Sequence, residues 1–146
     1  MSGGGDAHEE IRALKARYFR AIDTQDWALL RGVFTEDALT DFRDSVSPRD
    51  EALLIRGADG FVASVSGALA GARSAHHGHN PEITLTGADT AEGIWAMDDY
   101  IWVGPDSVLP FATLHGFGHY HERYVRQGGR WLIAETRLTR IRVETH

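Results

Sequence analysis

The sequence contains no cysteine among its 146 residues. This absence excludes disulfide bonds, thiolate nucleophiles and the zinc and iron–sulfur sites that depend on cysteine ligands. No apolar run approaches the roughly 20 residues that a membrane-spanning helix needs, so we expect no membrane partner. Positive charge is in deficit, because 15 Lys and Arg residues face 21 Asp and Glu residues and the net charge is −6. We therefore expect no nucleic-acid partner, since an acidic chain is a poor ligand for phosphate backbones.

The remaining composition is that of one ordinary globular domain. Hydrophobic residues make up 42% and charged residues 25% of the chain, a balance typical of domains that bury one core. Residues 1–6 are glycine-rich and lack the basic and apolar regions of a signal peptide. We interpret them as a flexible lead to a single domain, residues 7–146, and expect a cytoplasmic protein.

Helical periodicity dominates the first half of the sequence. One apolar stripe runs along residues 7–24, and shorter helices are predicted over residues 27–34 and 59–69. A first strand is predicted over residues 38–42. The polar segment that follows, up to residue 50, is typical of a loop.

The second half has the alternation of strands, with short turns rich in Gly and Asp between them. Predicted strands cover residues 75–86, 90–103, 110–127 and 130–143. Long strands joined by short turns favour an antiparallel meander. Three helices followed by a curved antiparallel sheet predict an α+β domain, and the bend of such long strands leaves a concave face that can hold a pocket.

Two side chains of the first helix are candidates for chemistry. Tyr18 lies on the apolar face, and Asp23 sits at the helix end. Because Asp26 suits the cap of the next helix better, Asp23 is free to point inward, where its carboxylate needs a partner. His76 is the candidate partner, since alternation places it on one sheet face and its neighbours His77 and His79 on the other.

The histidines also leave a metal-dependent reaction open as an alternative. His76, His77 and His79 are close in sequence, and three further histidines alternate along a later strand. Their spacing matches no recognised metal motif, so we expect no metal and no other cofactor. The histidines of the later strand are His115, His119 and His121.

Carboxylates, aromatic rings and arginines on the predicted strands complete the candidate set. Asp98 and Asp99 interrupt an apolar strand, and only one of the two can face the concave side. Arg137, Arg140 and Arg142 alternate with apolar residues on the last strand, where an arginine can reach an acidic group. The candidate substrate-binding residues are Trp95, Trp102, Phe111, Phe117, His119 and Arg137.

Three segments carry a resemblance to a known family. They are residues 11–38 (IRALKARYFRAIDTQDWALLRGVFTEDA), 75–99 (AHHGHNPEITLTGADTAEGIWAMDD) and 118–143 (GHYHERYVRQGGRWLIAETRLTRIRV). Together they resemble the SnoaL-like branch of the NTF2-like superfamily. The resemblance implies an α+β cone, with three N-terminal helices packed in a curved antiparallel sheet around a deep pocket. It also implies assembly as a homodimer or trimer.

The resemblance assigns roles to the candidate residues. Eliminating members of this superfamily use a histidine base braced by an aspartate, and Asp23 and His76 look like that dyad. Tyr18 occupies the position of a tyrosine in the bile-acid 7α-dehydratase. Asp98 or Asp99 looks like the strand carboxylate of the same enzyme, with a register that is ambiguous by one residue.

These residues lead to a functional hypothesis with stated alternatives. We expect a cofactor-independent lyase that eliminates water from a bulky apolar substrate, a steroid or an aromatic compound, with His76 as general base and Asp23 as its brace. Tyr18 would donate a hydrogen bond to the developing oxyanion. An isomerase or carbon–carbon lyase would use the same dyad. A non-catalytic module that binds a ligand or dimerises is the alternative from another class.

Overall fold

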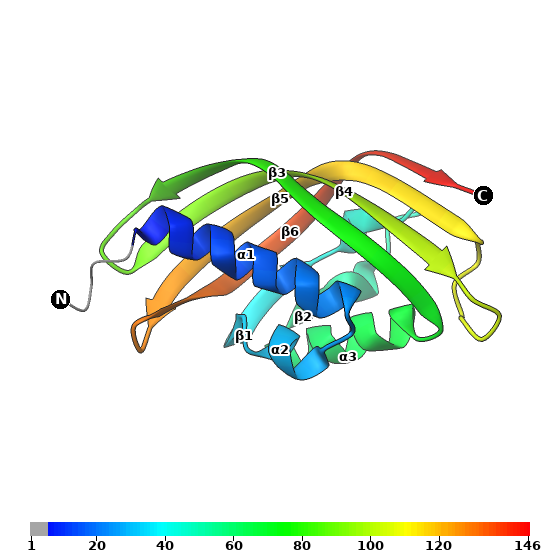
Figure 1. Ribbon diagram of the computed structural model, residues 1–146, viewed down its shortest axis with the longest axis horizontal. Helices are drawn as coiled ribbons and strands as arrows, with labels where there is room; N and C mark the ends of the chain where they lie inside the picture. The colour runs from blue at the N-terminus through cyan, green and yellow to red at the C-terminus, as the bar shows by residue number, and fades with distance from the viewer. Residues whose placement is uncertain (1–5) are drawn as a thin grey trace.

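Helix α1 begins directly after Asp6. The computed structural model describes residues 6–146, so the predicted lead lies outside the described residues except for Asp6. The Asp6 side chain accepts a hydrogen bond from the backbone N–H of His8 and caps the helix. The elements, shown in Figure 1, are α1 (Ala7–Asp23), α2 (Trp27–Arg31), β1 (Phe34–Asp41), the short 3₁₀ turns η1 (Arg43–Ser45) and η2 (Glu51–Leu53), β2 (Leu54–Arg56), α3 (Ala58–Leu69), β3 (Ala72–Leu85), β4 (Thr90–Val103), β5 (Thr113–Gln127) and β6 (Arg130–Thr145).

The strands form one curved sheet in the order β2-β1-β6-β5-β4-β3. Strands β3 to β6 make the predicted antiparallel meander. Strand β1, however, pairs with β6 in parallel, so the sheet is not antiparallel throughout. No hairpin joins these two strands, and their relative direction is therefore not set by a turn. Strand β2, which the sequence analysis did not predict, has only three residues and extends the β1 edge.

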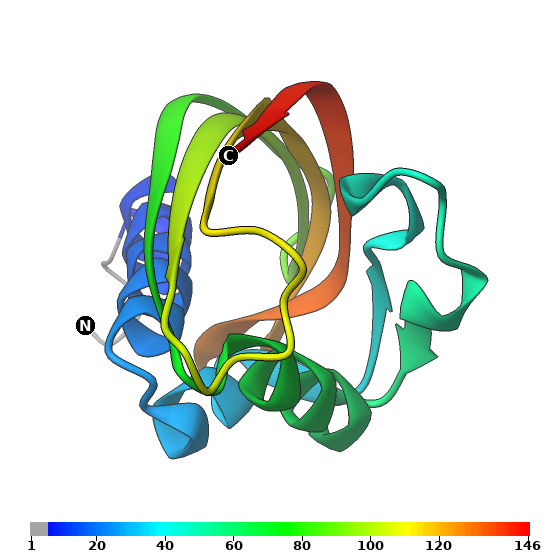
Figure 2. The ribbon, with the colours of Figure 1, turned by 90° about the vertical axis from the view of Figure 1, so that its right-hand side faces the viewer.

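The helices cover the concave side of this sheet. Helix α1 lies beneath the arch of strands, and α2 and α3 lie below it (Figure 1). Seen from one end, the sheet curls around an interior that α3 closes from below, and the segment between β4 and β5 crosses the near end (Figure 2). Within residues 6–146, no helix has both the length and the apolar composition that crossing a membrane requires.

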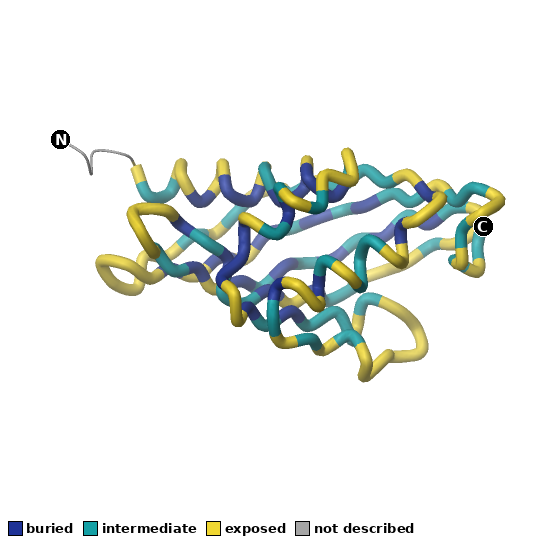
Figure 3. Tube along the Cα trace, turned by 90° about the horizontal axis from the view of Figure 1, so that it is seen from below, coloured by how far each residue is buried: buried dark blue, intermediate teal, exposed yellow. Residues whose placement is uncertain are grey.

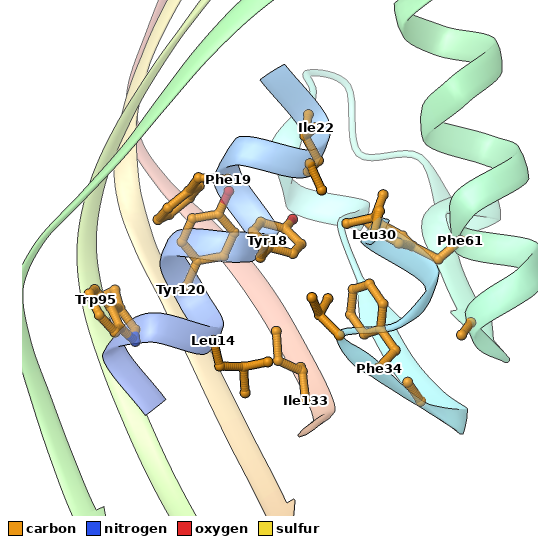
Figure 4. Packing of buried hydrophobic residues seen from close by; sticks show 14 of the residues in the cluster. Leu14, Tyr18, Phe19, Ile22, Leu30, Phe34, Phe61, Trp95, Tyr120 and Ile133 are labelled. Carbon is orange, nitrogen blue, oxygen red and sulfur yellow. The ribbon is translucent and has the colours of Figure 1, made fainter. Parts of the chain in front are cut away.

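The core is built from α1 and the central strands. Buried and exposed positions alternate along both, whereas the turns are exposed (Figure 3). Aromatic rings fill the space between sheet and helices (Figure 4). Phe34 packs edge-on against Tyr18 and Phe61, with ring centroids 6.0 and 5.2 Å apart. Because Phe34 belongs to β1, the predicted second helix ends earlier, at Arg31.

Replacing Phe34 should therefore test this core. Phe34 is 3% exposed, and Phe34→Ala should lower the free energy of unfolding by about 3–5 kcal/mol because it leaves a cavity between α1 and α3. The control Val108→Ala alters a side chain that is 80% exposed and should change it by less than about 0.5 kcal/mol. Urea unfolding followed by circular dichroism measures both values, and equal effects of the two substitutions would contradict this packing.

Candidate active site

The carboxylate of Asp23 joins the end of α1 to β3. It accepts three hydrogen bonds, from the Ser74 hydroxyl (2.9 Å), the His76 backbone N–H (2.8 Å) and His76 Nδ1 (2.7 Å). Asp23 was predicted to point inward toward a partner, and in the structure it contacts His76. Asp26, three residues after Asp23, caps α2 by accepting a hydrogen bond from the backbone N–H of Leu29.

The imidazole of His76 has a defined orientation. A carboxylate only accepts hydrogen bonds, so Nδ1 carries the proton and Nε2 keeps its lone pair. The ring stacks on Phe19, with centroids 6.2 Å apart and planes inclined by 18°. Nε2 lies 3.9 Å from Oδ2 of Asp99. The basic nitrogen is therefore on the side of the ring away from Asp23.

Asp99 is the strand carboxylate that faces inward. It is 3% exposed and is held by Arg140 through two hydrogen bonds, 2.7 Å from Nη1 to Oδ1 and 3.1 Å from Nη2 to Oδ2. Gly116 lies next to this ion pair, and a Cβ at that position would collide with Arg140 Nη1 and with Asp99 Oδ1. The missing side chain of Gly116 thus makes room for the pair.

His76, Asp99 and Arg140 line a mostly apolar cavity of about 210 Å³. Tyr18 and Tyr120 also line it, and Ser45 and Ser64 add two further hydroxyl groups. Burial raises the pKa of both tyrosines far above the usual value, and the charges of Glu122 and Asp99 raise the pKa of Tyr18 further against a hydrogen bond with Tyr120. Both hydroxyls are therefore neutral hydrogen-bond donors at physiological pH.

The opposite wall of the cavity is apolar and comes from different elements. Helix α3 contributes Phe61, Val65 and Leu69, and the segment from Phe42 to Ile55 adds further side chains. Phe111, one of the predicted substrate-binding residues, also lines the cavity. The titratable groups of the cavity thus lie on the side built by α1 and the sheet, and the side built by α3 and the loops is mainly apolar.

Trp95, a predicted substrate-binding residue, points toward the concave side of the sheet, but it does not line the cavity. It is 6% exposed and its indole N–H donates to the hydroxyl of Tyr124 (2.9 Å). Gly78, on the neighbouring strand, leaves the space that the ring occupies, because a Cβ there would approach the Trp95 ring to 3.0 Å. Trp95 is therefore a core residue.

The other predicted residues point away from the cavity, and their placement is a correction to the sequence analysis. Strand β4 turns its odd-numbered residues inward from Ala91 to Asp99, so the alternation directs even-numbered ones to the convex face. On β5 and β6, Tyr120 and Leu138 face inward and their neighbours face outward. The residues on the convex face are Asp98, Trp102, Phe117, His119 and Arg137.

Asp98 gathers three histidines on that convex face. Its carboxylate lies 2.9 Å from His79 Nε2 and 3.4 Å from ring nitrogens of His77 and His115. Despite its partial burial, these contacts lower the pKa of Asp98. Among residues 6–146, no group of side chains has the arrangement of a metal site.

Among the titratable residues of the cavity, the sequence did not single out Tyr120 and Arg140 as site residues. Arg140 was one of three arginines on the last strand. Because Leu138 faces inward, Arg140, two residues later, faces the same side, whereas Arg137 faces the other side. Tyr120 is flanked by His119 and His121, which drew attention to the other face of the strand. Alternation alone was a sufficient signal for both, once one inward residue on each strand was known.

Comparison with known proteins identifies the same fold. The sequence matches the family of SnoaL-like domains over residues 6–137. The hexachlorocyclohexane dehydrochlorinase LinA, type 2, is similar in structure, with a TM-score of 0.79 and 15% identity over 96% of this chain and 88% of that chain. A protein of Novosphingobium aromaticivorans with a proposed assignment as scytalone dehydratase has a TM-score of 0.77 and 15% identity, over 95% and 87% of the two chains. Rv3472 of Mycobacterium tuberculosis, described as of unknown function, has a TM-score of 0.71 and 27% identity, over 91% and 70%.

A substitution at Gly116 should test the geometry of the ion pair. Gly116→Ala forces the Arg140 guanidinium and the Asp99 carboxylate apart, and we expect it to lower the free energy of unfolding by about 1–3 kcal/mol. Gly67→Ala is the matched control, because nothing lies within 4 Å of a Cβ at that position on α3 and alanine favours a helix. Chemical denaturation compares the two, and a Gly116→Ala protein as stable as the wild type would contradict the described contact.

Proposed function

Because this chain belongs to the family of SnoaL-like domains, we propose that it is a cofactor-independent lyase in which His76 is the general base. The observation that carries the proposal is the 2.7 Å contact between Asp23 and His76 Nδ1 at the edge of a mostly apolar cavity. This contact leaves Nε2 as the basic atom. Similar folds in a dehydrochlorinase and in a protein assigned as a dehydratase support a reaction of the elimination type.

In the proposed reaction, His76 Nε2 removes a proton from a carbon atom that a carbonyl group or an aromatic ring activates. The C–H and C–O bonds of the substrate break, a carbon–carbon double bond forms, and hydroxide leaves. The imidazolium returns the proton to this hydroxide, so that water departs and His76 is neutral again. Asp23 stabilises the imidazolium and keeps the tautomer.

Tyr18 is the proposed oxyanion donor. Its hydroxyl stays neutral because burial raises its pKa, so it can donate a hydrogen bond to an enolate oxygen that forms when the proton leaves. Tyr18 and His76 line the same cavity. The base and the donor can therefore reach the same substrate.

The cavity favours a compact substrate. Its volume of about 210 Å³ is below the roughly 300–1,000 Å³ of common ligand pockets, which favours one or two rings over a steroid. Arg140 is paired with Asp99, so it offers no unpaired positive charge to an anionic substrate. A small aromatic compound is the proposed substrate class.

Two further reactions share this machinery, and one alternative needs none of it. An isomerase or a carbon–carbon lyase would use the same base and the same oxyanion donor, because the substrate decides which bond breaks. A module that only binds a ligand would keep the cavity without using Nε2 of His76. The orientation of that nitrogen by Asp23 favours the catalytic proposals.

We also propose that the chain forms a homodimer or trimer through the convex face of the sheet. Trp102, Ile141 and Val143 are 47%, 72% and 39% exposed on β4 and β6, and exposed apolar side chains of this size are typical of contact surfaces. Sedimentation equilibrium should show an oligomer for the wild type and a monomer for Ile141→Lys. A monomeric wild type would overturn this proposal.

Proton abstraction can be tested without knowing the natural substrate. The probe 5-nitrobenzisoxazole is a compact aromatic compound whose ring opens when a base removes a proton from carbon, with cleavage of the N–O bond to a coloured phenolate. We expect the wild type to accelerate this reaction above buffer, and His76→Ala to return the rate to the buffer value. His77→Ala is the control, because His77 lies next in sequence but on the other face of the sheet. Equal rates for the wild type and His76→Ala would overturn the proposed base.

The role of Asp23 can be measured in the same assay. Asp23→Asn keeps the size of the side chain but removes its charge, and we expect a rate lower by about 10²–10⁴-fold, the usual contribution of general-base catalysis. Asp26→Asn is the matched control, since asparagine also caps helices and the Asp26 side chain caps α2. If Asp23→Asn reacts as fast as the wild type, Asp23 has no catalytic role and only connects α1 to β3.

A further inference from the structure

A buried ion pair lies behind the wall of the cavity, and the proposed mechanism does not use it. Lys15 on α1 and Glu122 on β5 have fully buried side chains, with Nζ 2.8 Å from Oε2. The carboxylate also accepts hydrogen bonds from the hydroxyls of Thr136 (2.6 Å) and Tyr124 (2.7 Å). Glu122 therefore has its hydrogen-bonding capacity well satisfied on the side away from the cavity.

The ammonium group of Lys15 faces aromatic rings on its other side. Nζ lies 3.5 Å from the ring centroid of Tyr120, 3.8 Å from that of Tyr18 and 4.8 Å from that of Phe19. These separations are within the range of cation–π contacts. Tyr18 and Tyr120 are also the two tyrosines that line the cavity. Lys15 thus stands between a carboxylate and the two rings that carry the cavity's neutral hydrogen-bond donors.

Stability alone is a weak reason for such a pair. Removing two charges from water is costly, and well-packed apolar residues of similar volume usually stabilise a core as well or better. Burial lowers the pKa of Lys15 to about 8, while the charge of Glu122 and its hydrogen bond oppose that shift. The lysine is therefore charged at neutral pH, and its charge is available to act on its neighbours.

A cation on the face of a phenol ring changes what the hydroxyl can do. It draws electron density toward the ring, which makes the hydroxyl a stronger donor to an anion. The interior of a protein strengthens this effect because the effective dielectric constant is low. Lys15 lies between Glu122 and the two tyrosines that line the cavity. The positive end of the ion pair is therefore nearer to the cavity than the negative end.

We propose that Lys15 is a positioning residue that polarises Tyr18 and Tyr120, so that the cavity selects ligands carrying an oxygen anion on a compact aromatic or enolic framework. This inference rests on the proposed function in so far as the anion is an enolate formed by His76. It goes further in assigning the anion preference to a charge that never touches the ligand.

A pair of matched probes tests the anion preference without turnover. The anion of 2-chloro-4-nitrophenol is ionised at neutral pH, and 2-chloro-4-nitrotoluene is a neutral compound of nearly the same shape. The variant Lys15→Met/Glu122→Gln removes both charges together, which avoids leaving one buried charge unpaired. Isothermal titration calorimetry should show affinity for the phenolate about tenfold lower in this variant and unchanged affinity for the nitrotoluene, as expected for the loss of a desolvated cation–π contact.

A purely structural role of Lys15 makes a different prediction. If the substitutions damaged the cavity, the affinity for both probes would fall. If the charge of Lys15 had no effect on the ligand, the affinity for neither probe would change. Either result would overturn the proposal, as would a wild type that binds the two probes equally. Repeating the comparison in a Tyr18→Phe/Tyr120→Phe background completes a double-mutant cycle, in which the effect of the Lys15 exchange on phenolate binding should disappear.

The wild type alone offers a second readout if the charge-removing variant does not fold. Phenolate affinity should fall as the pH rises through about 8, because Lys15 then loses its proton, whereas nitrotoluene affinity should stay constant. The other titratable groups that face Lys15 are Glu122, Tyr18 and Tyr120, with Tyr124 bonded to Glu122. Burial raises the pKa of all three tyrosines far above this range. A phenolate affinity that does not fall at any alkaline pH at which the protein stays folded would overturn the proposal.

The two proposals can fail separately. If the phenolate preference depends on Lys15 but 5-nitrobenzisoxazole is not turned over, the anion-binding role stands and the lyase proposal fails. If His76-dependent turnover is present but the phenolate preference does not respond to the Lys15 exchange, the lyase proposal stands and the role of Lys15 fails.

Discussion

The candidate site depends on one carboxylate at the junction of a helix and a strand. Asp23 ends α1 and accepts hydrogen bonds from the Ser74 hydroxyl and from both the backbone and the ring of His76 on β3. The same contacts therefore hold the helix against the sheet and orient the imidazole. Because Tyr18 lies five residues before Asp23 on that helix, its distance from the dyad is set by the same junction.

The interior combines an apolar core with two buried ion pairs that have different positions relative to the cavity. Arg140 and Asp99 lie at its wall, where each neutralises the other beside His76. Lys15 and Glu122 lie behind the aromatic wall, with the positive end toward the tyrosines. The charges near the cavity thus belong to α1 and the central strands, which are the most buried parts of the fold.

Patterns in the sequence predicted the elements, and the resemblance predicted Asp23 and His76 as a pair. Periodicity located α1 and the four long strands because each has one buried face. It was insufficient for Asp98 and Asp99, since a register error of one residue exchanges the two sheet faces. Arg137 was chosen over Arg140 for the same reason. Lys15 lies on the apolar stripe of α1 but was not predicted to be buried, because a lysine at such a position commonly extends its ammonium group to solvent. Its partner Glu122 is 107 residues away in the sequence.

The two sides of the cavity come from separate parts of the chain, and this division bears on how new specificities arise. The acid–base groups belong to α1 and the long strands, whereas α3 and the segment from Phe42 to Ile55 supply the apolar wall. Mutations in that wall can reshape the space for a ligand without disturbing the hydrogen bonds of Asp23. The reactive groups can therefore stay unchanged in evolution while the substrate specificity changes. For the same reason, α3 is a suitable target for directed evolution of specificity.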